Sequence, residues 1–121
     1  MKKWVLVLAV CFIAGCQTAA TPLTFNEALS RAKAQPADMR QAYETRWADF
    51  NNANHIDDNG GCYYLSTGSL QQVLVIDKTG VVTDVIADVD NAKSRCFRQS
   101  YLHVQFPAPP LAPYYLYLNM Q

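Results

Sequence analysis

Apolar residues recur at helical spacing in the segment 24–53, and this pattern predicts two amphipathic helices. Thr24 and Glu27 stand at the spacing of a capping box, in which a threonine side chain accepts from the amide three residues on and a glutamate reaches back. The first helix should run to about Ala34 and end before Pro36, because proline has no amide proton and clashes with the preceding turn. The apolar positions of the two helices are Phe25, Ala28, Leu29 and Ala32, then Met39, Tyr43, Trp47 and Phe50. We expect both stripes to face the core, although an aromatic stripe could instead form a shelf for a ligand.

The pattern changes from helical to alternating after residue 61. Cys62–Leu65 is predicted to form a short aromatic strand, and 71–77 a strand rich in β-branched residues. Asp77–Gly80 is typical of a hairpin turn, because glycine tolerates the positive φ that such a turn requires. Val81–Val89 then returns as the partner strand. The face that we expect to be buried carries Val81, Thr83, Val85, Ala87 and Val89, and the solvated face carries Asp84, Asp88 and Asp90.

A third helix and a last strand complete the predicted fold. Asn91 is a suitable N-cap for a helix that runs to about Val104 and carries Cys96 near its middle. Phe106–Pro113 contains four prolines and should run extended. Tyr114–Met120 alternates in polarity and predicts a strand that joins the hairpin. The predicted fold class is α+β, with two N-terminal helices followed by a β-β-α-β unit that forms a small antiparallel sheet.

The first residues have the order of a secretory signal. Lys2 and Lys3 precede an apolar run from 4 to 14, which is shorter than the roughly 20 residues that cross a bilayer. The run ends in Ile13-Ala14-Gly15-Cys16, which resembles the bacterial lipobox, whose cysteine receives diacylglycerol and becomes the acylated first residue of the mature protein. The resemblance implies a lipoprotein that is lipidated at Cys16. The other interpretation is an ordinary signal peptide in which this cysteine is incidental.

On the lipoprotein interpretation the chain has three parts. Residues 1–15 are a cleaved signal peptide, 16–23 a lipidated tether, and 24–121 a single periplasmic domain, with a helical part at 24–53 and a β-β-α-β part at 62–121. Several acyl chains would attach the domain firmly, since each buried methylene adds about 0.8 kcal/mol. The residue after the lipidated cysteine is Gln17. An aspartate at this position would resemble the signal that retains lipoproteins at the inner membrane of Gram-negative bacteria. In a Gram-negative host the expected location is therefore the cell envelope, on the outer membrane and facing the periplasm, whereas a Gram-positive host would change this location.

Charge and cysteine positions narrow the possible functions. Cleavage would remove two of the ten basic side chains and leave eight against ten acidic ones, without a basic cluster, which argues against nucleic-acid binding. Cys11 lies in the signal run and Cys16 takes the lipid, so Cys62 and Cys96 remain in an oxidising compartment, where we expect them to form a disulfide. No CxxC or related pattern supports the alternative of a metal-binding or catalytic cysteine.

The second half of the chain resembles a known family. A hairpin with Asp77-Lys78-Thr79-Gly80, a helix, Phe106-Pro107-Ala108-Pro109 and a final strand follow in the order of the TonB C-terminal domain superfamily, over about residues 62–120. The pair Cys62 and Cys96 makes the chain more similar to disulfide-bearing variants in lipoproteins and surface proteins than to classical TonB. The resemblance implies an extracytoplasmic unit that binds a protein partner. In the TonB family that partner is a short peptide, which pairs with the free edge of the sheet.

Few residues could carry catalysis or bind a metal ion. Asp57–Gly60 lacks the alternating ligands and the closing glutamate of a calcium loop. His55 and His103 each stand alone in the sequence, whereas a zinc site needs several partners. The three aspartates of the hairpin could be paired carboxylates, but carboxylates on an alternating strand are usually its solvated face. We therefore predict a protein that is not an enzyme and that needs no cofactor or metal.

Two functions fit these observations. In the first, an exposed strand binds an envelope protein partner by backbone pairing, or pairs with a second copy in a homodimer. The candidate residues of this strand are Tyr114, Tyr115, Leu116, Tyr117 and Leu118. In the second, the domain inhibits a host or envelope hydrolase such as lysozyme, although the two N-terminal helices favour the first function. An enzymatic function would require Asp84 and Asp88 to lie buried and close together.

Overall fold

The computed structural model describes residues 22–58 and 61–120. The predicted signal peptide, Cys16 and the tether up to residue 21 lie outside the described residues, and so does Gly60 of the predicted loop. Within the described ranges, no helix combines the length and the apolar character that crossing a bilayer requires.

Two helices form the first part of the fold, as predicted. α1 spans Phe25–Ala34 and α2 spans Ala37–Asn54. The Thr24 hydroxyl oxygen accepts from the Glu27 amide at 3.2 Å, so half of the capping box forms. The Glu27 carboxylate accepts from the Thr24 hydroxyl at 3.1 Å, instead of from the Thr24 amide that the box would use.

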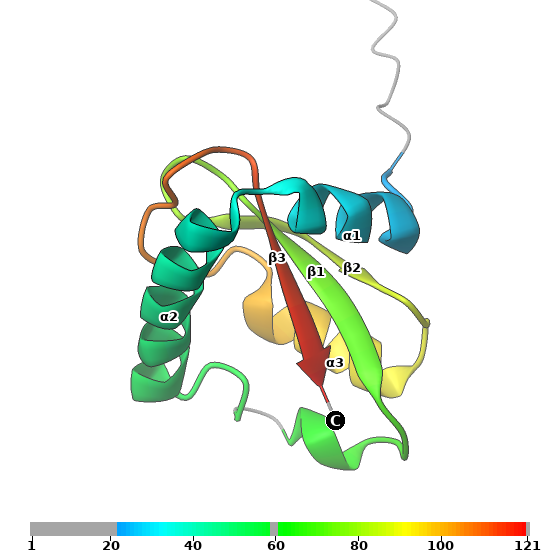
Figure 1. Cartoon of the computed structure of the whole chain (residues 1–121). Coiled ribbons are helices and arrows are strands. Elements are labelled where there is room, and N and C mark those ends of the chain that lie inside the picture. The colour runs from blue at the N-terminus through cyan, green and yellow to red at the C-terminus, as the bar shows by residue number, and fades with distance from the viewer. Residues whose placement is uncertain (1–21, 59–60, 121) are drawn as a thin grey trace, which may run out of the picture.

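A three-stranded sheet with a third helix forms the second part (Figure 1). The elements are the short 3-10 helix η1 at Cys62–Tyr64, then β1 at Leu70–Ile76, β2 at Val82–Ala87, α3 at Ala92–Tyr101 and β3 at Tyr114–Met120. The strand order is β2-β1-β3, and β1 pairs antiparallel with both neighbours. Because β1 is central, both β2 and β3 are edge strands of the described sheet.

Helices cover both faces of this sheet (Figure 1). α1 crosses one face, where a small core consists of Ala28, Ala32, Val73 and Tyr115. Side chains of α2, α3 and η1 fill the larger core on the other face, which contains Tyr43, Trp47, Cys62, Leu74, Phe97, Tyr101, Phe106, Tyr114 and Leu116. Trp47 and Phe106 stack there with ring centroids 4.8 Å apart. The prediction that the aromatic stripe of α2 belongs to the core is thus confirmed, with Tyr43 and Trp47 buried.

The hairpin turn between β1 and β2 has the predicted chemistry. The Asp77 carboxylate accepts from the Thr79 amide at 2.9 Å, from the Thr79 hydroxyl at 2.6 Å and from the Val81 amide at 3.0 Å. Gly80 has a φ of 97°, which only glycine adopts without strain. Its carbonyl accepts from the Phe106 amide at 2.8 Å, so the turn also holds the start of the proline-rich segment.

Replacing Asp77 with asparagine should weaken the change in the protein's stability with pH in the acid range. The hydrogen bond from the Thr79 hydroxyl, followed by those from backbone amides, holds the pKa of Asp77 below its ordinary value of 3.8. A lowered pKa in the folded state gives stability that is complete above the ordinary pKa and is lost as the pH falls through the lowered one. The difference in melting temperature between wild type and Asp77→Asn should therefore be largest near pH 7 and shrink at about pH 2. Asp49→Asn, an exposed change on α2, is the control, and an equal difference at both pH values would contradict the prediction.

The predicted strand at Cys62–Leu65 is wrong, because these residues form the 3-10 helix η1 and the bend after it. The preceding Gly61 is left-handed with a φ of 66°, and the Leu65 amide donates to the Cys62 carbonyl at 3.3 Å. Burial does not alternate here: Cys62 is fully buried, whereas Tyr64 is 92% exposed. The segment contacts α3 instead of a neighbouring strand, and this contact replaces the pairing that a strand needs.

The predicted buried face of the second strand is also partly wrong. The register between β1 and β2 shifts after Val75, which pairs with Asp84, while Ile76 pairs with Val82. This bulge leaves Thr83 exposed, with its hydroxyl donating to the Val75 carbonyl at 3.2 Å. As a result Val82 joins Val85 in the core, whereas the alternation had placed Val81 and Thr83 there.

The third helix is shorter than predicted, since it ends at Tyr101 rather than near Val104. The Asn91 side chain caps its start by accepting from the Ser94 amide at 2.8 Å, as expected of an N-cap. After Tyr101 the chain turns to the outer edge of β2, where the His103 amide donates to the Val82 carbonyl at 2.9 Å. Pairing with a sheet edge thus replaces the last turn of the predicted helix.

Candidate functional site

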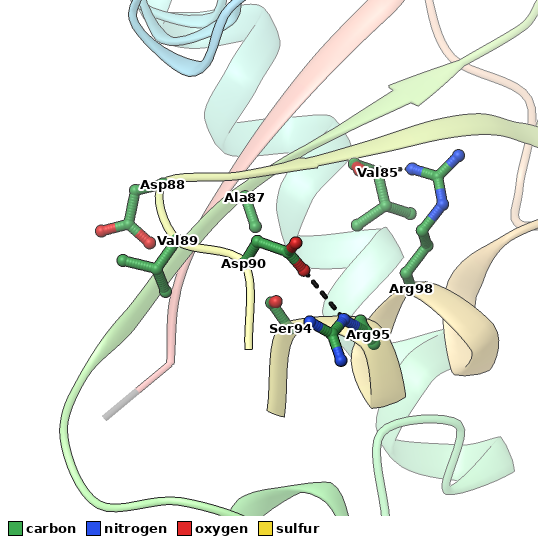
Figure 2. Close-up of a pocket in the computed structure, with 8 residues that line it drawn as sticks. All are labelled: Val85, Ala87, Asp88, Val89, Asp90, Ser94, Arg95 and Arg98. Atoms are coloured by element: carbon green, nitrogen blue, oxygen red, sulfur yellow. Dashed lines mark hydrogen bonds and ion pairs between the residues drawn. The ribbon is translucent and has the colours of Figure 1, made fainter. Parts of the chain in front are cut away.

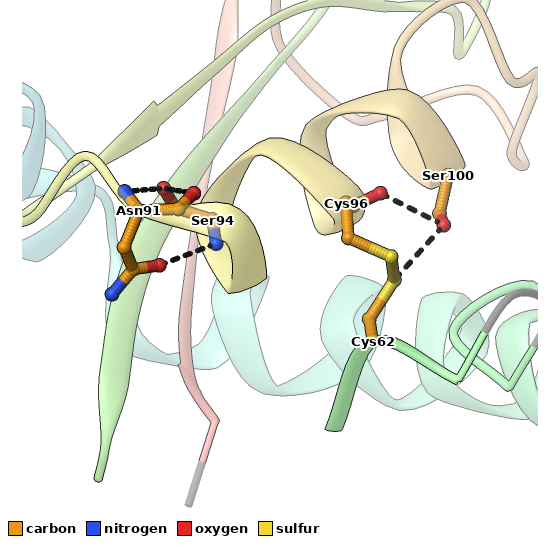
Figure 3. The surroundings of a disulfide bond; sticks show 5 residues. All are labelled: Cys62, Asn91, Ser94, Cys96 and Ser100. Carbon is orange, nitrogen blue, oxygen red and sulfur yellow. Dashed lines mark hydrogen bonds between the residues drawn. A yellow bond between two sulfur atoms is a disulfide. The ribbon is translucent and has the colours of Figure 1, made fainter. Parts of the chain in front are cut away.

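The predicted disulfide between Cys62 and Cys96 is present and joins η1 to α3 (Figure 3). Its Cα atoms are 5.5 Å apart, and the Ser100 hydroxyl lies 3.6 Å from the Cys62 sulfur. Because Cys62 is fully buried against the aromatic core, we assign this pair to the fold.

A cleft of about 380 Å³ lies between the end of β2 and α3 (Figure 2). Its two guanidinium groups are already engaged by the chain itself. Arg95 donates to Asp90 at 2.9 Å, and Arg98 donates to Asp84 and to the Val85 carbonyl, both at 2.7 Å. An anionic ligand would have to compete with these carboxylates, so the cleft is a poor anion site.

The hairpin aspartates do not form a catalytic pair. Asp84 bonds to Arg98, and Asp88 is exposed and accepts from the Gln71 amide at 3.1 Å. The two are thus not buried together, which was the condition for acid/base chemistry. His55 is exposed at the end of α2, His103 is exposed near β2, and the described residues contain no group of three or more potential metal ligands.

All five residues of the predicted binding strand lie on β3, but their side chains mostly fill the two cores. Tyr114 and Leu116 face the larger core, and Tyr115 faces α1, and all three are buried. Burial raises the pKa of Tyr114, whose hydroxyl has no hydrogen-bond partner among the described residues. Tyr117 and Leu118 are half-buried, one on each face of the sheet. A partner could therefore contact β3 mainly through its backbone.

The outward-facing backbone groups of β3 belong to every second residue. Both backbone groups of Tyr115 point away from β1, because they bond to the side chain of Gln35. Peptide groups alternate in direction along an extended strand, so those of Tyr117 and Asn119 also point outward. Among the described residues, no hydrogen bond satisfies the outward groups of Tyr117 and Asn119, and Asn119 is exposed.

Gln35 closes the first part of this edge and was not anticipated from the sequence. Its Nε2 donates to the Tyr115 carbonyl at 2.8 Å and its Oε1 accepts from the Tyr115 amide at 2.9 Å. One side-chain amide thus takes the place of one residue of a neighbouring strand. Gln35 is the C-cap of α1 and its side chain also donates to the Ala32 carbonyl at 3.2 Å, so the position is fixed from the helix.

The opposite edge of the sheet, on β2, is closed over most of its length. The Val82 amide donates to the Val104 carbonyl at 3.0 Å, and the Val82 carbonyl accepts from the His103 amide. Further along, the Val85 amide donates to the Asp84 carboxylate at 2.9 Å, and Arg98 occupies the Val85 carbonyl. The second half of β3 is therefore the more open edge of the described sheet.

Comparison with known proteins gives no relative for this chain: no family model, no curated protein and no solved structure matches it. The geometry of the site therefore carries the functional argument.

Proposed function

We propose that this protein is a lipoprotein anchored through Cys16, and that it acts as a non-enzymatic binding module for an envelope protein. A short extended segment of the partner pairs with the outer edge of β3. One observation carries the proposal: the outward backbone groups of Tyr117 and Asn119 have no partner within the described residues, while the chain itself bonds those of Tyr115 on β3 and those of Val82 and Val85 on β2. The resemblance of residues 62–120 to the TonB C-terminal domain superfamily supports the same mode of binding.

Backbone pairing alone would be weak at this site. Two outward residues offer four hydrogen bonds, each with a net value of about 0.5–1.5 kcal/mol, and association costs at least about 4 kcal/mol of lost freedom. Side-chain contacts of the partner must supply the rest. The half-buried Tyr117 and Leu118 present apolar surface on opposite faces beside the open edge. A partner segment with apolar side chains on both faces fits this surface best.

The proposal predicts that a photo-cross-linking residue at Asn119 captures an envelope protein in intact cells. The same residue at Gln99, exposed on α3, is the matched control and should capture much less of that protein. With the cross-linker moved to Leu118, Asn119→Pro removes one outward amide and places a ring where the partner would pair, so capture should fall sharply relative to the same cross-linker beside the native Asn119. The variant should still fold, because proline is tolerated where an edge amide faces outward. An adduct of twice the mass of the chain would identify a second copy as the partner. Equal capture from both positions, or capture that persists in the proline variant, would refute strand pairing at this edge.

Replacing Cys16 with serine should release the protein from the membrane fraction. Serine cannot form the thioether to diacylglycerol, so the anchoring chains, worth about 0.8 kcal/mol per buried methylene, would be absent. Fractionation of cells with an antibody to the domain measures this. Cys11→Ser, in the apolar run of the predicted signal, is the control and should leave the protein in the membrane. If the Cys16→Ser protein stayed membrane-bound, the lipid anchor would be excluded.

A further inference from the structure

We infer that Gln35 is a stop, which limits a pairing strand to Tyr117 and Asn119 and thereby selects short extended segments over long β-strands. The inference rests on the proposed function, because it states how far along β3 a partner can pair. The observation behind the inference does not depend on that function: the side-chain amide of Gln35 bonds to both backbone groups of Tyr115, at 2.8 and 2.9 Å.

Displacing Gln35 would bring a partner no additional hydrogen bond. A strand that continued to Tyr115 would make two backbone hydrogen bonds there and break the two that Gln35 makes now. It would also break the bond from Gln35 to the Ala32 carbonyl and order one more of its own residues. Since Gln35 is 8% exposed and is held from the end of α1, its carboxamide keeps the position. Pairing therefore ends after Tyr117.

The surface beyond Gln35 indicates how the partner leaves the edge. A hollow of about 290 Å³ lies next to Gln35 and is lined mainly by apolar side chains, with Arg31 as its only charged group. The lining residues besides Gln35 and Arg31 are Ala34, Pro36, Leu111, Pro113 and Tyr115. Arg31 donates to the Tyr115 hydroxyl at 2.9 Å and lies 5.6 Å from the centre of its ring. A segment that turns out of the strand direction after Tyr117 can place one apolar side chain in this hollow, whereas a strand that stays straight meets Gln35.

A tethered strand tests the stop without knowledge of the partner. An Asn-Gly turn and a seven-residue strand of alternating threonine and valine are fused after Gln121 of the full-length chain, in detergent. In a two-residue hairpin, the third, fifth and seventh residues of the added strand fall opposite Asn119, Tyr117 and Tyr115. Amide exchange, resolved by NMR, should show protection of the third and fifth residues and about tenfold less at the seventh. In Gln35→Ala the seventh residue should become protected by about tenfold as well.

Two further variants distinguish a failure of the stop at Gln35 from a failure of the proposed function. Gln41→Ala, an exposed change on α2, should leave the pattern of the unmodified fusion unchanged. Gln35→Met keeps the length of the side chain but not its hydrogen bonds. It should also make the seventh residue protected, which would show that the effect of Gln35→Ala comes from the lost hydrogen bonds and not from lost packing. Equal protection of all three residues with Gln35 in place, or an unprotected seventh residue in both Gln35 variants, would overturn the stop and leave the proposed function intact. No protection at the third and fifth residues would overturn the proposed function itself.

Discussion

Replacing Cys62 and Cys96 together with alanine should lower the free energy of unfolding by about 3–4 kcal/mol. The disulfide joins residues 34 apart in sequence, and a closed loop of that size restricts the unfolded chain by about this amount in the chain-entropy model. In a small domain the melting temperature should fall by roughly 15–25 °C, which thermal unfolding by circular dichroism measures. The loss should be concentrated at η1, since Cys62 and Tyr63 are its links to the aromatic core.

Ser100→Ala is the matched control for the disulfide. Ser100 contacts the Cys62 sulfur and donates to the Cys96 carbonyl at 3.1 Å, so the variant disturbs the surroundings of the bond and leaves the bond itself intact. It should cost no more than about 1 kcal/mol. A fall of only a few degrees in the double alanine variant would mean that packing alone holds η1 against α3.

Replacing Gly80 with alanine should destabilise the protein by at least about 2 kcal/mol, through backbone strain and a steric clash together. The φ of 97° is unfavourable for any residue with a side chain. In addition, a Cβ atom at Gly80 would overlap the Phe106 carbonyl oxygen and lie 2.9 Å from its carbon. Because Phe106 is buried against Trp47, the carbonyl cannot move freely. Urea unfolding followed by tryptophan fluorescence measures the loss.

Gly68→Ala separates strain from clash at Gly80. Gly68 has a φ of 108°, but a Cβ atom there would meet nothing within 4 Å. This variant should therefore lose only the strain, about 1 kcal/mol. If both glycine variants were equally stable, the contact between the turn and Phe106 would be unimportant.

Local patterns predicted most of the secondary structure correctly, because those elements depend on neighbouring residues. The N-cap at Asn91 and the turn at Asp77–Gly80 need only side chains within a few positions, and both formed as expected. The alternation of β3 also gave the correct strand, since its two faces meet two different cores.

The errors arose where distant residues decide the structure. The bulge between Val75 and Ile76 changes which residues at the start of β2 face the core, and this part of the β2 edge also bonds to the segment after α3. η1 contains aromatic residues typical of strands, but its disulfide places it on a helix. In each case the alternating pattern was real over only a few residues, and tertiary contacts were stronger than local preference.

The candidate site was only half predictable for the same reason. The position of β3 at the edge of the sheet followed from the order of the elements. The bonds between Gln35 and Tyr115 span 80 positions in sequence, and no local pattern distinguishes this glutamine from an ordinary residue before a proline. The sequence therefore indicated that β3 lies at the edge of the sheet, but not which part of that edge is open.

The anchor proposed at Cys16 would attach the protein at the end of the sheet that α1 crosses. α1 crosses near the start of β3, whereas η1 and the end of β3 lie at the opposite end of the sheet (Figure 1). Leu23 already packs against the small core, so a chain anchored at Cys16 has only six residues between the lipid and the fold, a reach of at most about 25 Å. The open half of β3 would then face away from the lipid surface. A partner would approach from the aqueous space, with Tyr64 exposed at the same end of the molecule.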